Sequence, residues 1–94
     1  LGNKILCVDD DPEVLAFMTR CLAIDGYEVV QSTSGRQALE LLATHEYGLV
    51  LLDIAMPGLD GWEVCRRIKS DPALAGIKVY FITAKPIDRT SSRI

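Results

Sequence analysis

The sequence predicts an α/β fold in which helices cover both faces of a parallel sheet. Three short apolar runs each end in a polar residue: Ile5-Leu6-Cys7-Val8 before Asp9, Leu49-Val50-Leu51-Leu52 before Asp53, and Val79-Tyr80-Phe81-Ile82 before Thr83. Uninterrupted apolar runs are typical of strands that are buried on both faces. Strand and helix patterns also alternate along the chain, which favours parallel strands joined by right-handed crossovers.

The first strand is expected over residues 4–8, and a helix follows it. Asp11 suits the N-cap of this helix, Pro12 its first position and Glu13 its first turn. The helix is expected to end near residue 24, before Asp25-Gly26. Its apolar face is expected to carry Val14, Leu15, Met18, Cys21 and Leu22.

The second strand, expected over residues 27–31, is less apolar than the others, which suits the edge of a sheet. The segment Ser32-Thr33-Ser34-Gly35 is expected to form a turn, and Ser34 and Gln37 have the spacing of a capping box. The inner side of the second helix is expected to carry Ala38, Leu41, Leu42 and His45.

The third strand is expected to end at Asp53, and a loop with Pro57 and Gly58 follows. Asp60 and Glu63 have capping-box spacing at the start of a third helix. Its inward residues are expected to be Val64, Cys65 and Ile68. The fourth strand is expected over residues 77–82.

Length and composition restrict the function. A chain of 94 residues predicts a single domain, and 49% hydrophobic residues are enough for a core. The net charge of −3 and the lack of a basic stripe argue against nucleic-acid binding by this segment. Neither a signal peptide nor an apolar stretch of membrane-spanning length is seen. The widely spaced Cys7, Cys21 and Cys65 look like small buried residues, so we expect a cytoplasmic protein.

The acidic strand ends are best explained by the flavodoxin-like, doubly wound strand order 2-1-3-4, in three α/β/α layers. In this order Asp9, Asp10 and Asp53 become neighbours at the carboxyl edge of the sheet. Crowded carboxylates repel one another, and a bound cation usually offsets that repulsion. Oxygen ligands without histidine or cysteine favour Mg²⁺. An aspartate beside Mg²⁺ can attack phosphorus, and the Thr83 hydroxyl would stabilise the transferring group.

Three segments resemble the receiver domain of two-component response regulators: Val8-Asp9-Asp10-Asp11, residues 51–61, and Phe81-Ile82-Thr83-Ala84. The resemblance runs in order from Lys4 to about Pro86. It implies that Asp53 accepts a phosphoryl group from a histidine kinase or a phosphotransfer protein, with Mg²⁺ as the cofactor. Such a domain acts as a phosphorylation switch and is not a turnover enzyme, since it catalyses only its own phosphorylation and dephosphorylation.

The resemblance also implies roles for the neighbours of Asp53. Asp10 corresponds to the direct Mg²⁺ ligand, and Asp9 to a partner that usually acts through water. The backbone carbonyl of Ala55 corresponds to the remaining protein ligand, and Thr83 to the switch hydroxyl. The residues implied to shape or modulate the pocket are Met56, Pro57, Gly61, Ala84 and Lys85.

The sequence departs from the family pattern after the fourth strand. Receivers carry a Lys-Pro pair after a fifth strand, whereas Lys85-Pro86 directly follows Thr83-Ala84, so the role of that lysine is not transferred to Lys85. Lys85 is either a solvated loop charge or a modulator beside the pocket. We therefore expect an incomplete receiver domain over residues 1–94, which lacks the family's fourth helix, fifth strand and fifth helix. The fourth strand would then be an uncovered edge, which predicts dimerisation, strand exchange or poor solubility.

Two other functions are compatible with parts of this pattern. A receiver-like interaction module that is never phosphorylated is favoured by the missing lysine and disfavoured by the acidic residues and Thr83. A phosphohydrolase similar to haloacid dehalogenases would need a second aspartate two residues after Asp53, where this chain has Ala55.

Overall fold

The fold consists of a four-stranded sheet and three helices. The computed structural model describes residues 3–82. Its elements are β1 (Lys4–Val8), α1 (Pro12–Ile24), β2 (Glu28–Ser32), α2 (Gly35–Thr44), β3 (Leu49–Asp53), α3 (Gly61–Ser70) and β4 (Lys78–Ile82).

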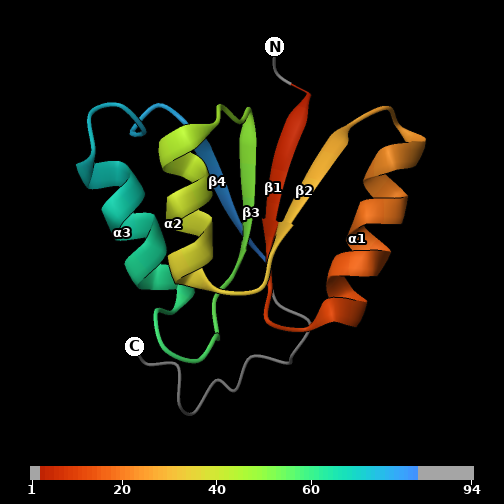
Figure 1. Ribbon diagram of the computed structural model, residues 1–94, viewed down its shortest axis with the longest axis horizontal. Helices are drawn as coiled ribbons and strands as arrows, with labels where there is room; N and C mark the ends of the chain where they lie inside the picture. Colours follow the sequence, from red (N-terminus) through yellow and green to blue (C-terminus); the bar gives the residue numbers. More distant parts are fainter. Residues whose placement is uncertain (1–2, 83–94) are drawn as a thin grey trace.

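The sheet has the order β2-β1-β3-β4, and all neighbouring strands are parallel. This confirms the order expected from the sequence. The strands run downward in Figure 1, and the connections to α1, α2 and α3 leave from the lower edge. Val8 pairs with Leu52 on one side and Ser32 on the other. The residues that follow β1 therefore lie next to the end of β3.

Each face of the sheet has its own core, because successive side chains of a strand point to opposite faces. On one face the strands pack against α2 and α3, and on the other against α1, as the separation of the helices in Figure 1 shows. The first core contains Leu6, Val8, Ala38, Leu42, Val50, Leu52, Val64 and Ile68, and the second contains Ile5, Cys7 and Leu15. The three-layer arrangement is thus confirmed.

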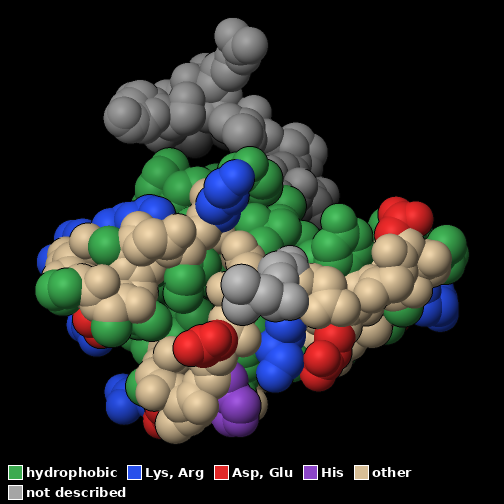
Figure 2. Space-filling model, turned by 90° about the horizontal axis from the view of Figure 1, so that it is seen from above, with side chains coloured by type: hydrophobic (Ala, Val, Ile, Leu, Met, Phe, Trp, Pro, Cys, Tyr) green, Lys and Arg blue, Asp and Glu red, His purple; other side chains and the backbone are tan. Residues whose placement is uncertain are grey.

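Some large hydrophobic side chains are not covered by these layers. Tyr80 of β4 is 58% exposed and Trp62 of α3 is 60% exposed. Figure 2, seen from the amino ends of the strands, shows hydrophobic side chains reaching the surface. The Trp62 ring is tilted against Phe81 of β4, with 4.6 Å between the ring centroids. This contact joins the first turn of α3 to the carboxyl-terminal half of β4.

Several local expectations were wrong. β2 is shifted by one residue from the expected range, because Ser32 pairs with Val8 in the ladder and does not belong to the turn. β4 begins at Lys78, one residue later than expected. His45 is exposed, because α2 ends at Thr44 and His45 adopts an extended C-cap conformation. Cys21 is exposed as well, so only part of the expected apolar face of α1 is buried.

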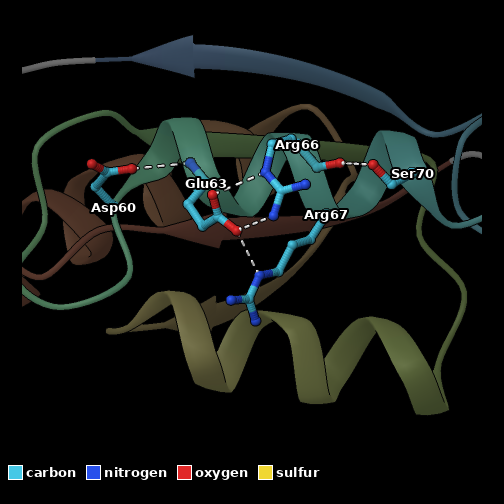
Figure 3. Close-up of polar contacts among 5 residues, drawn as sticks. All are labelled: Asp60, Glu63, Arg66, Arg67 and Ser70. Carbon is cyan, nitrogen blue, oxygen red and sulfur yellow. Dashed lines mark hydrogen bonds and ion pairs between the residues drawn. The ribbon is translucent and has the colours of Figure 1, made fainter.

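Neither expected capping box is complete. The Gln37 side chain accepts from the Thr33 amide and not from that of the N-cap Ser34. The Asp60 side chain accepts a hydrogen bond of 3.0 Å from the Glu63 amide. The Glu63 carboxylate turns away from Asp60 and toward Arg66 and Arg67, as Figure 3 shows. Hydrogen bonds from these two arginines lower the pKa of Glu63 to about 2. The second half of the capping box is therefore replaced by an exposed ion-pair cluster.

Candidate functional site

Three carboxylates lie together at the carboxyl ends of the strands, the lower edge of the sheet in Figure 1. Asp9 and Asp10 directly follow β1, and Asp53 is the last residue of β3. One oxygen from each carboxylate lies within 4.8 Å of the others. Asp9 is 3% exposed and Asp53 is 5% exposed, whereas Asp10 lies closer to solvent. The structure thus brings together the three aspartates that the strand order predicts as neighbours.

Hydrogen bonds on both sides fix Asp9. Its amide donates to the carbonyl of Ser32, at 3.0 Å, which extends the ladder between β1 and β2 by one bond. Its side-chain oxygen Oδ1 accepts from the Asp11 amide, at 2.9 Å. Asp11 in turn is the N-cap of α1 and accepts from the Glu13 amide. Asp9 is therefore held between the next strand and the first turn of α1.

Ser32 is a contributor to the site that the sequence did not reveal. Its side chain is 1% exposed and donates to the Ser34 carbonyl, at 2.8 Å. The turn-like composition of Ser32-Thr33-Ser34-Gly35 obscured its place in β2. The available signal was its place two positions after Val30, since residues two apart along a strand face the same side of the sheet.

Asp53 is held by the beginning of the loop that follows it. Its Oδ1 accepts a long hydrogen bond of 3.4 Å from the Ala55 amide. The Gly61 amide donates to the Ile54 carbonyl, at 2.9 Å, and so closes the base of the loop. A Cβ atom on Gly61 would overlap the Asp53 carbonyl oxygen, so only glycine lets α3 begin this close to the end of β3.

The loop itself is anchored by Met56, which is buried in the core on the α2 and α3 side. Pro57 borders an open hollow between α2 and the loop. These two predicted pocket residues would therefore affect the carboxylates through the position of the loop.

The electrostatics of the cluster are unfavourable without a cation. Burial raises the pKa of Asp9 above its ordinary value, and the negative charges of Asp53 and Asp10 raise it further. The hydrogen bond from the Asp11 amide acts in the opposite direction. A buried carboxylate whose ionised form is disfavoured in this way is stabilised by a nearby positive charge.

The donors fit Mg²⁺. Within residues 3–82, Asp9, Asp10 and Asp53 form the single group of acidic, histidine or cysteine side chains close enough to share an ion. All three donors are carboxylate oxygens, which Mg²⁺ prefers. The Ala55 carbonyl lies in the same short segment and remains a predicted ligand. The predicted site residues Thr83, Ala84 and Lys85 lie outside the described residues.

An open hollow beside Asp9 lies between the first two turns of α1 and the end of β4. It is lined by Asp9, Asp11, Glu13, Val14, Phe17, Met18 and Ile82. Among the described residues, this hollow reaches Asp9 of the carboxylate cluster.

The family model that describes the response regulator receiver domain matches residues 5–93. The chain is 47% identical over 81 residues to a probable cyclic di-GMP phosphodiesterase of Vibrio cholerae, covering 86% of this chain and 18% of that protein. It is 46% identical over 91 residues to the response regulator MprA of Mycolicibacterium vanbaalenii, covering 97% of this chain and 38% of that protein. The chain therefore spans only a minor part of these relatives.

Solved structures show the same arrangement. The N-terminal domain of a response regulator receiver protein from Methanoculleus marisnigri superimposes with a TM-score of 0.85 at 42% identity, over 93% of this chain and 71% of that chain. The response regulator TrrA of Thermotoga maritima, in complex with Mg²⁺-BeF, gives a TM-score of 0.84 at 33% identity, over 96% and 76% of the two chains. No helix within residues 3–82 is both long enough and apolar enough to cross a bilayer.

Proposed function

The chain belongs to the family of response regulator receiver domains, and on that premise we propose that Asp53 accepts a phosphoryl group in a reaction that requires Mg²⁺. The observation that carries this proposal is the meeting of Asp9, Asp10 and Asp53 within 4.8 Å at one sheet edge. The complex of the related TrrA with Mg²⁺-BeF supports the choice of metal.

The chemistry is a displacement at phosphorus. A carboxylate oxygen of Asp53 attacks the phosphorus of a phosphohistidine on a histidine kinase or a phosphotransfer protein. The new P–O bond forms while the P–N bond breaks, and the electron pair of the P–N bond stays with the imidazole nitrogen. Water later attacks the aspartyl phosphate and releases inorganic phosphate, which restores the carboxylate.

The residues around Asp53 divide the remaining tasks. Asp9 and Asp10 would hold Mg²⁺ together with Asp53 and the Ala55 carbonyl. The bound ion would neutralise negative charge on the phosphoryl oxygens as the group is transferred. The rigid end of β3 keeps the Asp53 side chain at the sheet edge, so little reorganisation is needed when a donor arrives.

Phosphorylation would act as a switch and not as a step of a turnover enzyme. The Thr83 hydroxyl, two positions after Phe81, would turn toward the phosphoryl group. This movement would shift the equilibrium between two conformations of the surface near β4. The domain is proposed to act in the cytoplasm, where the free thiols of Cys7, Cys21 and Cys65 would stay reduced.

The test is incubation with acetyl phosphate and Mg²⁺, followed by intact-protein mass spectrometry. We expect the mass to rise by one phosphoryl group, and we expect no rise for Asp53→Asn or when EDTA replaces Mg²⁺. Asp71→Asn is the matched control, because Asp71 is an exposed aspartate outside the cluster and should leave the gain unchanged. An equal gain in Asp53→Asn would refute the proposed acceptor. No gain in the unmodified chain would favour a receiver-like interaction module that is never phosphorylated.

A further inference from the structure

The first turn of α2 lies against the loop that follows Asp53. Gly35, the first residue of α2, is buried. A Cβ atom on Gly35 would lie 2.5 Å from the Leu59 carbonyl oxygen, 2.7 Å from Cγ2 of Val64 and 3.1 Å from Cβ of Leu59. Atoms in folded proteins do not pack at the two shorter distances, so any side chain at position 35 would displace a neighbour.

The α2 side of this contact is firmly held. The Ser34 side chain caps α2 by accepting from the Gln37 amide at 3.1 Å. The Gln37 side chain accepts from the Thr33 amide at 3.1 Å, which ties the same turn to the end of β2. Further along α2, Ala38 and Leu42 are buried in the core. A shift of the whole first turn would break several of these interactions at once.

The loop side is held less firmly. Within residues 54–60, hydrogen bonds hold the two ends of the loop. The Ala55 amide donates to the Asp53 side chain and the Gly61 amide to the Ile54 carbonyl, while Asp60 accepts from the amides of Glu63 and Val64. Leu59 ends the stretch between them, residues 56–59, which within the described residues is held by the packing of Met56 and Leu59 on the core and not by hydrogen bonds. The displacement would therefore fall mainly on the loop, which also carries the Ala55 carbonyl.

We propose that Gly35 is a positioning residue for the metal site, because its lack of a side chain lets Leu59 rest against α2 and so fixes the loop that follows Asp53. This inference rests on the proposed function, since it concerns the same Mg²⁺ site. It adds a residue from an element that supplies no ligand.

The direction in which Gly35→Ala changes the protein distinguishes a steric cause from a change in helix propensity. Glycine is a poor helix former, so replacing it with alanine within a helix normally stabilises a protein. At Gly35 the steric contact with Leu59 opposes that gain. A weakened metal site in Gly35→Ala would therefore come from the contact and not from the helix.

The test compares Gly35→Ala with Gly76→Ala, using Mn²⁺ as the probe ion and electron paramagnetic resonance to measure free Mn²⁺. A Cβ atom on Gly76 would meet nothing within 4 Å, so it is a matched control for the same exchange. We expect Gly35→Ala to raise the Kd for Mn²⁺ about tenfold or more and Gly76→Ala to leave it unchanged. Thermal unfolding in EDTA is recorded for each variant, so that affinity is compared among folded proteins.

Val64→Ala separates metal affinity from general stability. It truncates a fully buried core side chain and should lower the melting temperature, while the Kd for Mn²⁺ stays at the unmodified value. In Gly35→Ala/Val64→Ala the contact with Val64 is relieved but the Leu59 carbonyl is still in the way, so the Kd should remain raised. A normal Kd in the double variant, or a Kd raised equally by Val64→Ala alone, would overturn the proposal.

Leu59→Ala tests, without adding an atom, whether the packing of Leu59 fixes the loop and the metal site. Alanine keeps the carbonyl and the Cβ that face Gly35 but removes the outer atoms of the side chain, which pack on the core beside Ala38 of α2. We expect this loss of packing too to raise the Kd for Mn²⁺. This variant keeps the proposal testable if Gly35→Ala does not fold. Unmodified protein that binds no Mn²⁺ would contradict the proposed function itself. If the unmodified protein binds Mn²⁺ and Gly35→Ala binds it with the same Kd, only this inference is overturned. If Gly35→Ala does not fold, the same holds for an unchanged Kd in Leu59→Ala.

Discussion

Replacing Asp9 with asparagine should stabilise the metal-free protein. Asparagine has nearly the same shape as aspartate, and its side-chain oxygen can still accept the hydrogen bond from the Asp11 amide. What changes is the charge. Asp9 is almost fully buried beside the carboxylates of Asp10 and Asp53. Removing its negative charge therefore relieves repulsion, and the similar size of asparagine leaves no cavity.

The size of the effect follows from the separation of the charges. Two unit charges 4.8 Å apart repel by ~0.9 kcal/mol at the dielectric constant of water and by ~3.5 kcal/mol at an effective dielectric constant of 20. Because Asp9 is buried and Asp10 lies closer to solvent, we expect a gain of about 1–3 kcal/mol. For a domain of this size, that gain raises the melting temperature by about 4 °C or more.

The assay is thermal unfolding followed by circular dichroism at neutral pH, in EDTA and then in Mg²⁺. Asp9→Asn should melt above the unmodified protein in EDTA. Mg²⁺ should raise the melting temperature of the unmodified protein more than that of Asp9→Asn, which has lost one charged ligand. The difference in melting temperature between Asp9→Asn and the unmodified protein should therefore be smaller in Mg²⁺ than in EDTA.

The pH dependence has a definite sign. The folded-state pKa of Asp9 lies above its ordinary value of 3.8, so the unfolded chain releases this proton at a lower pH than the folded chain does. The contribution of Asp9 to stability therefore falls as the pH rises from that ordinary value through the raised one. Below this interval Asp9 is protonated in both states, and the advantage of Asp9→Asn should disappear.

Asp71→Asn is the control for the exchange itself. Asp71 accepts a hydrogen bond of 2.9 Å from the Ala73 amide two residues later, the same local arrangement as Asp9 with Asp11, but it is exposed and outside the cluster. It should show no comparable gain. The electrostatic reasoning is refuted if Asp9→Asn melts at or below the temperature of the unmodified protein in EDTA.

Three further predictions concern other parts of the fold. Gly61→Ala should lower the free energy of unfolding by about 1–3 kcal/mol and weaken Mn²⁺ binding, because its Cβ would overlap the Asp53 carbonyl; unchanged urea unfolding would contradict this. Glu63→Gln should lower the melting temperature slightly at neutral pH, because it removes the charge that pairs with Arg66 and Arg67. This loss should vanish in high salt and as the pH falls from about 4.5 toward 2, since the two arginines lower the pKa of Glu63. A loss that persists in high salt would argue against ion pairing as its origin. The chain should self-associate as its concentration rises, because β4 is the edge of the sheet within residues 3–82; sedimentation velocity that shows only monomer from micromolar to millimolar concentration would exclude this.

The strand order and the acidic cluster could be predicted because both depend on local patterns with few alternatives. The apolar runs before Asp9 and Asp53 indicate where these strands end, and bringing the two aspartates together favours β1 beside β3. Parallel strands then bring their carboxyl ends to one edge. The bounds of β1, α1 and β3 agree with the expected ones for the same reason.

The misjudged residues depend on contacts that a local pattern does not contain. Cys21 has the helical spacing of a buried residue, but α1 alone covers its face of the sheet within residues 3–82 and buries only Leu15 fully. Glu63 has the spacing of a capping box, yet two arginines on the same helix compete for its carboxylate. The role proposed for Gly35 depends on Leu59, which lies against it although it is 24 positions further along the chain.

The tilted contact of the Trp62 ring with Phe81 gives the protein an intrinsic optical reporter. Trp62 is the single tryptophan of the chain, so all indole fluorescence comes from one known position. It lies one residue after Gly61, whose amide closes the loop behind Asp53, and its ring contacts β4 two residues before Thr83. A change at either strand end would alter the surroundings of this indole. Its emission could therefore follow the state of the site in real time, without any attached dye.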